Sequence, residues 1–307
     1  MRKKRILSLC LVVIFIMAQT SVFAANNSDI TAIGKTSLLE KTYFGVEQTG
    51  AFVERVAKLE KEVMGNETSA SLLEKVDTLY TYTKVSTPEA SSFLLKLNSA
   101  EWLFNHNISH LPVQTRMENL EKQLFGNTST GAFKERLDRL MQVAFTGGVV
   151  DASLVSVPKD TLVKIRTLSK VDSSKSRKGD IVAFKVLDDV YVEGYLAIAA
   201  GTQGQGRITR VEQRANFGRD AKVEIAFDTV EALDDTIVKT LIGDKAKAET
   251  KSLALAAGAS VAGLAILGPI GIVGGAFVHG QEVVIPTGTD MFIQTAETTE
   301  VYGVRMK

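Results

Sequence analysis

The sequence has almost no cysteine, which limits how the protein can be stabilised. Cys10 is the only cysteine among 307 residues. Leu9 stands before it, where a lipoprotein signal needs a small residue, so we do not expect lipidation of this cysteine. A chain without disulfides depends on ordinary hydrophobic cores or on assembly for its stability.

The N-terminus has the pattern of a secretory signal peptide, residues 1–24. Four basic residues at positions 2–5 precede the apolar run Ile6 to Ala18. Val22 and Ala24 place small residues at −3 and −1, which predicts cleavage after Ala24. The sequence therefore predicts export to the periplasm or cell envelope. A signal that is retained as a membrane anchor is the alternative.

Neither sign of charge is in excess. Lys and Arg number 36, Asp and Glu number 35, and the formal net charge is +1. Removal of the four basic residues of the signal leaves about −3. This balance argues against a nucleic-acid partner.

The sequence also lacks the motifs of common catalytic and cofactor sites. The mature chain has no thiol nucleophile, and no serine stands in a Gly-x-Ser-x-Gly turn. Gly201, Gly204 and Gly206 lie between predicted strands and not before a helix, so they do not form a phosphate-binding loop. We predict no catalytic residue, no cofactor and no enzyme activity. A hydrolase acting on the cell wall is an alternative, and it would need Asp, Glu or His gathered at loops of the β region.

Paired histidines and aspartates are the remaining candidates for a metal or acid–base site. His106 and His110 stand four residues apart, but no third ligand accompanies them, and capping histidines near Pro112 are the commoner case. Asp188-Asp189 and Asp234-Asp235 lie between predicted strands, where aspartate favours turns. We therefore predict no metal site.

The N-terminal half contains an internal repeat with a period of twenty residues, which is the distance along the sequence from Leu39 to Leu59. Three segments align from a Leu-Glu-Lys that begins at Leu39, Leu59 and Leu120. Counted from the leucine, each segment has an aromatic residue or Met at offset five, directly followed by Gly. Each also has an acid at offset fifteen and a base at offset sixteen. The spacing predicts two degenerate units before Leu120, with Trp102 and Phe104 in core positions.

Each unit has apolar residues at three- and four-residue steps, which predicts helices of about 14 to 16 residues. Thr49, Ser69 and Ser129 or Thr130 are candidate N-caps, and the glycine of each unit is expected to end its helix in the left-handed conformation. We predict a helical repeat region over residues 26–145. Its expected core residues are Phe44, Phe52, Leu59, Met64, Leu72, Leu79, Leu120, Phe125, Phe133 and Leu140.

The role of this repeat region stays open between two interpretations. One is a packed helical array without a site of its own, because single short helices must stack to bury their apolar faces. The other is a docking surface, on which the alternating acids and bases meet a cell-wall polymer or an envelope protein. Charges at this spacing are typical of a solvated face with i,i+4 pairs.

The C-terminal half changes to the two-residue period of strands. Residues 146–159 are short of charge and helix signals and are interpreted as a linker. A β domain follows over residues 160–305, a small barrel or sandwich. Its strand candidates are Leu162 to Arg166, Asp180 to Leu187, Val190 to Ala197, Gly206 to Val211, Lys222 to Phe227 and Thr236 to Leu241.

A short recurrence ties the far end of the chain to this sheet. The run from Ile198 to Thr202 recurs as Ile285 to Thr289, with Gly and Thr as its last two residues, and a strand pattern follows each copy. Residues from Glu282 to Val304 are therefore predicted to complete the same β domain.

Two resemblances follow from these motifs. The runs Gly206–Glu212, Phe217–Arg219, Lys222–Ile225 and His279–Thr289, together with the Gly-rich stretch between them, resemble a β domain of secreted bacterial envelope proteins. The Leu-Glu-Lys/Phe-Gly units are similar to repeats of other exported bacterial proteins. Together the resemblances cover most of the mature chain. They imply an envelope location and bring no chemistry with them.

Residues 253–278 form an apolar Gly-rich segment without one charged side chain. A helix of this length could cross a bilayer, but Gly268-Pro269 favours a break into two short helices. Three arrangements stay open: a helical hairpin that enters a bilayer or packs on copies of itself, one kinked span, and a hairpin buried in the protein. The small residues expected at an association face, and the break between the helices, are Gly258, Gly263, Gly268, Pro269, Gly271 and Gly275.

The sequence thus predicts an α+β multidomain protein: an N-terminal α-helical repeat region, then a small β barrel or sandwich with an inserted apolar helical hairpin. We interpret it as a non-enzymatic structural or assembly protein of the cell envelope. Its expected partners are membrane lipid or copies of itself, and the alternative partner is a wall polymer or envelope protein bound by the repeats. The apolar segment makes membrane association or self-association the expected role.

Overall fold

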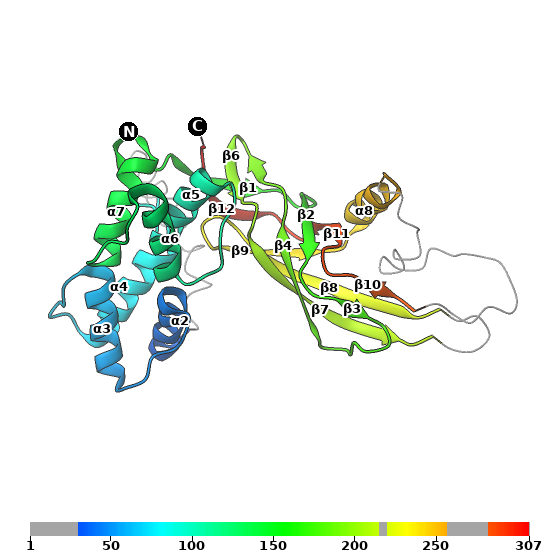
Figure 1. Ribbon diagram of the computed structural model, residues 1–307, viewed down its shortest axis with the longest axis horizontal. Helices are drawn as coiled ribbons and strands as arrows, with labels where there is room; N and C mark the ends of the chain where they lie inside the picture. Colours follow the sequence, from blue (N-terminus) through cyan, green and yellow to red (C-terminus); the bar gives the residue numbers. More distant parts are fainter. Residues whose placement is uncertain (1–29, 215–219, 257–281, 307) are drawn as a thin grey trace, which may run out of the picture.

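The computed structural model describes residues 30–214, 220–256 and 282–306. Helices at the N-terminal side lie at one end of the molecule, and strands and one further helix lie at the other (Figure 1). The architecture is therefore α+β with a small β barrel, as predicted. The predicted signal peptide and most of the predicted apolar hairpin lie outside the described residues.

Six helices of 12 or 13 residues form the N-terminal part. They are α2 (Ala32–Phe44), α3 (Phe52–Met64), α4 (Leu72–Lys84), α5 (Phe93–Asn105), α6 (Val113–Phe125) and α7 (Phe133–Ala144). Successive helices start one repeat period apart, with one extra residue before α5. The two degenerate units predicted before Leu120 are therefore real, and Ala100 of α5 takes the place of the repeat leucine. Trp102 is buried there, and Phe104 is partly buried against the same core.

The glycines end the helices as predicted, but the predicted N-caps are wrong. Gly45, Gly65 and Gly126 close α2, α3 and α6 in the left-handed conformation. Helices α3 and α7 begin two or more residues later than expected, after N-caps Ala51 and Ala132 that make no side-chain cap hydrogen bond. Among the predicted cap residues and their neighbours, the loop backbone instead donates to a buried glutamate of the preceding helix. Those bonds run from Gln48, Thr68 and Ser129.

The helices fold back on one another and do not extend as an open array. Helix α2 contacts α3, α4 and α6, and α3 also contacts α7, so the first two units touch the last two. Tyr43 stacks on Phe133 of α7, with ring centroids 5.1 Å apart. The expected core leucines Leu59, Leu79, Leu120 and Leu140 are each at most 2% exposed.

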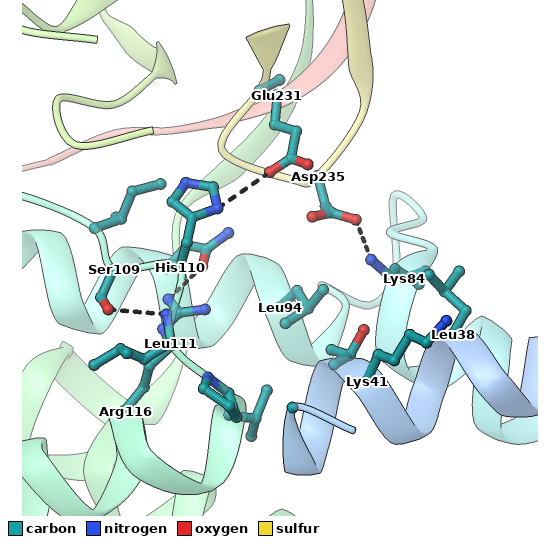
Figure 2. A pocket seen from close by; sticks show the side chains of 17 residues that line it. Leu38, Lys41, Lys84, Leu94, Ser109, His110, Leu111, Arg116, Glu231 and Asp235 are labelled. Atoms are coloured by element: carbon teal, nitrogen blue, oxygen red, sulfur yellow. Dashed lines mark hydrogen bonds and ion pairs between the residues drawn. The ribbon is translucent and has the colours of Figure 1, made fainter. Parts of the chain in front are cut away.

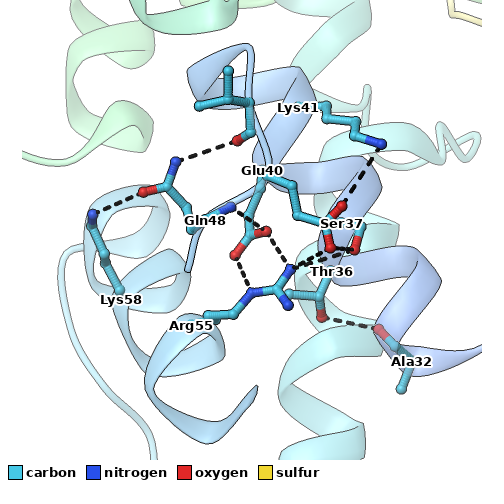
Figure 3. Close-up of polar contacts among 10 residues, drawn as sticks. Ala32, Thr36, Ser37, Glu40, Lys41, Gln48, Arg55 and Lys58 are labelled. Carbon is cyan, nitrogen blue, oxygen red and sulfur yellow. Dashed lines mark hydrogen bonds and ion pairs between the residues drawn. The ribbon is translucent and has the colours of Figure 1, made fainter. Parts of the chain in front are cut away.

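A buried acid–base pair joins successive helices and recurs with the repeat. Glu121 accepts hydrogen bonds from Nε and Nη2 of Arg136 at 2.9 and 2.8 Å and from the backbone N–H of Ser129 at 3.0 Å. Figure 3 shows the same arrangement around Glu40 and Arg55. The pairs are Glu40–Arg55, Glu60–Lys75, Glu101–Arg116 and Glu121–Arg136. The solvated face expected for the charges of the repeat is therefore wrong for these four glutamates, which are buried between two helices. The acids at offset fifteen, Glu54, Glu74 and Glu135, are exposed as expected.

The β region contains a closed barrel of six strands in the order β11-β2-β4-β7-β8-β9. Each neighbouring pair is antiparallel. Barrel strands are β2 (Leu162–Thr167), β4 (Ile181–Val186), β7 (Gln203–Glu212), β8 (Lys222–Glu231), β9 (Ile237–Leu241) and β11 (Asp290–Thr295). Five of the six predicted strands correspond to single barrel strands within a few residues. The sixth, Val190 to Ala197, is divided into two by a turn at Glu193-Gly194.

A second sheet has the order β1-β12-β6-β5. Its strands are β1 (Ala152–Val157), β5 (Val190–Val192), β6 (Tyr195–Ile198) and β12 (Thr299–Val304), and a separate pair joins β3 (Val171–Asp172) to β10 (Val284–Ile285). The expected linker, residues 146–159, thus contains strand β1, which pairs with β12 along its length. Low charge in this run reflects a strand with a buried side and not an extended connector.

The barrel interior is filled by aromatic and branched side chains. Phe184 of β4 and Phe227 of β8 meet edge to face, with centroids 5.3 Å apart. Gly204 and Gly206 of β7 leave the room for these rings, because an added Cβ at Gly204 would lie 2.2 Å from Phe184 Cζ. The three glycines of this stretch therefore serve barrel packing and a turn.

The recurrent Gly-Thr runs make the same contacts at two places in the barrel. Gly201 N–H donates to the Val186 carbonyl at 2.9 Å, and Val186 N–H donates back to the Thr202 carbonyl at 2.7 Å. Gly288 and Thr289 make the same pair of bonds with Thr167, at 2.8 and 3.0 Å. Both glycines have positive φ, 89° and 88°. The recurrence is an internal repeat of the barrel.

Strands on both sides of the apolar segment belong to one barrel. Strand β11, which follows the segment, pairs with β2 and β9, which precede it. The prediction that residues from Glu282 to Val304 complete the same β domain is confirmed. The arrangement in which one span separates two halves of the β domain is therefore wrong, because the chain leaves and re-enters the same closed sheet.

Candidate functional site

The helices dock on the barrel through α5 and the loop that follows it. Asn98 Nδ2 donates to the Leu233 carbonyl at 2.7 Å, and Trp102 Nε1 donates to Asp189 Oδ1 at 2.9 Å. In the loop, the Ile108 N–H donates to the Ala200 carbonyl at 3.0 Å. These three bonds fix α5 against the turns at one end of the β region.

Apolar packing continues across this junction. One cluster of buried side chains includes residues from all six helices and also residues of the β region. The β residues in it are Leu196, Ala199, Leu233, Tyr302 and Val304. Leu94 of α5 belongs to the same cluster and is 4% exposed. The two regions thus share a core.

A cavity of about 420 Å³ lies at the edge of this junction, between α2, the loop after α5 and the turn between β8 and β9 (Figure 2). Its titratable lining residues come from both regions. They are Lys41, Lys84, His110, Arg116, Glu231 and Asp235. Lys84 pairs with Asp235, which joins α4 to the β8–β9 turn. Arg116 is held by Glu101 and Asn98, so most of the charge around the cavity is already paired within the protein.

His110 is the polar group that joins the loop to strand β7. The backbone N–H of Gln203 donates to its Nε2 at 2.6 Å, which requires that this nitrogen carry no proton. Burial, assisted by the positive charge of Arg116, lowers the pKa of His110 to about 4. His110 is therefore neutral at neutral pH.

Glu231 faces the other ring nitrogen, with Oε2 3.8 Å from His110 Nδ1. Burial, and then the nearby charge of Asp235, raise the pKa of Glu231 to about 7. A neutral imidazole beside a carboxyl that titrates near neutrality is a feature of acid–base sites and also of structural contacts between two regions. Here Nε2 of His110 accepts a hydrogen bond from a backbone N–H, so it is not available to activate a hydroxyl nucleophile. The arrangement therefore fits a structural contact between the helices and the β region.

The other paired residues singled out in the sequence have structural roles. His106 is the C-cap of α5, with φ 48°, and its ring meets Trp102 edge to face. Asp189 accepts hydrogen bonds from Trp102 and from the Ala200 N–H. Asp234 accepts from Thr236 within its turn and from the Tyr302 N–H. In the described part of the chain no three His, Cys, Asp or Glu side chains gather as a metal site.

The base of the apolar segment is the second candidate site. Helix α8 (Asp244–Ala256) lies along β11 and leads into the segment. Gln294 Oε1 accepts from the Ala246 N–H at 3.1 Å, and Thr250 Oγ1 accepts from the Phe292 N–H at 2.9 Å. On the return side, the Val283 N–H donates to Ser173 Oγ at 3.1 Å, and the Ser173 N–H donates to the Val283 carbonyl at 2.9 Å. Both ends are thus bonded to the β region.

Apolar side chains face solvent where the segment leaves and returns. Leu255, in the last turn of α8, is 56% exposed, and Val284 of β10 is 38% exposed. Helix α8 was not expected from the sequence, which placed the first helix of the segment at Leu253. The predicted association residues lie outside the described residues, namely Gly258, Gly263, Gly268, Pro269, Gly271 and Gly275.

The predicted repeat-core residues differ in how far they are buried. Phe133 is 3% exposed, whereas Phe44 and Met64 are partly buried against the helical core. Phe52 and Leu72, the first residues of α3 and α4, are half-buried. Phe125 is 42% exposed at the end of α6. Tyr43, Glu40 and Glu121, which were not among the predicted core residues, are fully buried.

Comparisons with known proteins give little. No known protein family matches the chain, and no curated protein matches it. Among solved structures, the chain is similar to ComB10 of the Com type IV secretion system of Helicobacter pylori, with 13% sequence identity and a TM-score of 0.27. That match covers 48% of this chain and 90% of that chain. This similarity is too low to bring the function of that protein to this chain.

Within residues 30–214, 220–256 and 282–306, no helix is both long and apolar enough to cross a membrane. Helix α8 contains only the first four residues of the charge-free run, Leu253 to Ala256.

Proposed function

We propose that the protein is a non-enzymatic structural or assembly protein of the cell envelope, which associates with the membrane or with copies of itself through residues 253–278. Such a role needs no catalytic group. It needs a stable folded body, and an apolar segment that this body presents to lipid or to another protein surface.

The observation that supports the proposal is the way the barrel holds the apolar segment. Both flanks of the segment are bonded to the β region, α8 to barrel strand β11 and Val283 to Ser173 after β3. The apolar side chains nearest to the segment on each side, Leu255 and Val284, are exposed. The described chain on each side of the segment therefore presents an apolar side chain to solvent.

The helical repeats support less well the alternative of a docking module that binds its partner through charged side chains. Four of their glutamates bind an Arg or Lys of the next helix and are buried. These charges hold the helices together, so they are not presented to a wall polymer or envelope protein. Nor does the cavity favour a wall hydrolase, since His110 and Lys84 are engaged in contacts across the junction.

The test replaces residues 257–278 with a short Gly/Ser loop and leaves α8 intact. Native envelopes that contain the intact protein or the loop variant are extracted with carbonate, and the released protein is examined by sedimentation and circular dichroism. We expect the intact protein to stay with the membrane fraction and the variant to be released as a folded monomer.

Other outcomes separate the two parts of the proposal. If carbonate releases both proteins, but the intact one sediments as an oligomer and the variant as a monomer, the segment serves self-association. If both are released as folded monomers, the proposal is wrong. An unfolded variant is recognised by circular dichroism, and substitution of two segment residues, Ile266→Asn and Ile272→Asn, then replaces the deletion in the same assay.

A further inference from the structure

The turn beside the return point of the apolar segment carries an unneutralised cluster of basic side chains. This basic turn, residues 173–180, connects β3 to β4. Lys175, Arg177 and Lys178 lie within it and are exposed. Ile181, the first residue of β4, is 54% exposed and adds an apolar side chain directly after the turn.

The acids of this turn do not neutralise its bases. Asp172, just before the turn, accepts hydrogen bonds from the Ser174 N–H at 3.1 Å and from Ser174 Oγ at 2.6 Å, and pairs with Lys170 at 3.2 Å. Asp180 accepts from the backbone N–H of Arg177 at 2.8 Å. Among the described residues, the side chains of Lys175, Arg177 and Lys178 have no carboxylate partner.

The basic residues of the neighbouring β7–β8 hairpin differ in this respect. Arg207 pairs with Asp228 at 2.9 Å, Arg210 pairs with Glu212 and Glu224, and Arg214 pairs with Glu282 at 3.4 Å. The described basic residues of this hairpin that pair in this way are thus neutralised within the fold. Within the described part of the chain, the basic turn, in contrast, keeps three unpaired positive charges next to strand β10.

The position of the basic turn relates it to the apolar segment. Val284 pairs with Asp172, and Val283 is bonded in both directions to Ser173, the first residue of the turn. The basic turn therefore begins beside Val283 and Val284, the first described residues after the apolar segment apart from Glu282. Strands β3 and β10, which make this contact, lie at the end of the β region away from the helices (Figure 1).

We infer that the basic turn binds the headgroups of anionic lipids at the membrane surface. This inference rests on the proposed function, because the turn reaches the headgroup layer only if the adjacent segment enters the bilayer. Lys and Arg beside a membrane-inserting segment are attracted to anionic lipid, and the exposed apolar Ile181 suits the interface between headgroups and acyl chains. A wall polymer could also attract the same cations, but it offers no role for Ile181 and Val284.

The experiment measures binding of the full mature protein to two kinds of vesicle. One consists of phosphatidylcholine alone, and the other of phosphatidylcholine mixed with phosphatidylglycerol. The test variant carries Lys175→Gln, Arg177→Gln and Lys178→Gln. A matched control carries Lys122→Gln, Lys134→Gln and Arg139→Gln, which removes the same charge from exposed positions on α6 and α7.

We expect the intact protein to bind the anionic vesicles more tightly, and the test variant to lose roughly 10- to 100-fold of that affinity, since each basic residue near the surface contributes about a factor of five. Raised salt should reduce the same difference. The control variant should bind as the intact protein does. Binding of all three proteins to the neutral vesicles should be equal.

Two results would overturn the inference and leave the proposed function in place: equal binding of the test variant and intact protein to anionic vesicles, or an equal loss in the control variant. Loss of binding to purified wall polymer, with vesicle binding unchanged, would assign the turn to the polymer. Failure of the membrane part of the proposed function is seen separately, when the intact protein binds neither kind of vesicle more tightly than the variant lacking residues 257–278.

Discussion

At the scale of single residues, the buried glutamates explain why the repeat has an acid beside its leucine. Glu121 is fully buried. Burial opposes its ionisation, but the hydrogen bonds from Arg136 and Ser129 outweigh burial and lower the pKa of Glu121. A charge held in this way stabilises the fold only while its partner is present.

Removal of the Arg136 side chain should therefore destabilise the protein strongly, because Arg136 is buried and neutralises Glu121. We expect Arg136→Leu to lower the free energy of unfolding by about 3–5 kcal/mol, because Glu121 is left buried without a compensating charge. Urea unfolding followed by circular dichroism measures this difference. The control is Arg139→Leu on the same helix, exposed, with an expected change within about 0.5 kcal/mol.

A second variant distinguishes the charge from the loss of packing. Combining Glu121→Met with Arg136→Leu removes both charges, and we expect it to recover most of the stability lost in Arg136→Leu. If the double variant is as unstable as the single one, the pair acts through shape and not through its charge.

At the scale of elements, the loop after α5 and the end of β8 meet through His110 and Glu231, whose pKa values are shifted in opposite directions. The pKa of His110, about 4, lies below its usual value, so the stability it contributes is present above about pH 6.5 and is lost as pH falls toward 4. The pKa of Glu231, about 7, lies above its usual value of 4.5, so its contribution is present below 4.5 and is lost as pH rises toward 7. In the intact protein, the two groups change the free energy of unfolding in opposite directions as the pH rises, so their effects partly cancel.

Single substitutions should expose each slope between pH 4.5 and 6.5. Relative to the intact protein, the free energy of unfolding of Glu231→Gln should rise more steeply with pH, because the opposing slope is gone. That of His110→Gln should fall with rising pH relative to the intact protein. The Glu231 side chain is 40% exposed, so solvent screening reduces the size of its effect. Thermal unfolding across this pH range measures both, and slopes of equal sign in the two variants would contradict the assignment.

The same elements show how far sequence reasoning extends. The repeat period, the terminal glycines and the strand alternation were sufficient to predict the helices and five barrel strands, because each of these signals is local. The acids and bases of the buried pairs recur at fixed positions of the repeat, so the residues themselves could be recognised in the sequence. Which acid pairs with which base could not be predicted, because an acid on one helix and a base on the next come together only after the connecting loop has turned back. Strand β1 was missed for a related reason: its pairing partner, β12, follows the apolar segment and lies near the end of the sequence.

At the scale of the whole molecule, a shared core should make the helices and the barrel unfold together. Trp102, the only tryptophan, is buried in α5 and bonded to Asp189 of the β region, so its fluorescence reports the junction. We expect the transition followed by Trp102 fluorescence to coincide with the one followed by far-ultraviolet circular dichroism. Fluorescence that changes at a lower urea concentration than the circular dichroism would show that the junction opens first.

The pairing of β1 with β12 also sets an order in which the parts of the chain can fold. Helices α2 to α7 make contacts between neighbouring units and need only the first half of the chain, whereas β1 has no partner among the described strands until β12 has arrived. Non-local pairings of this kind form slowly. Until β12 has been synthesised, β1 is therefore an unpaired strand edge with which other chains could pair.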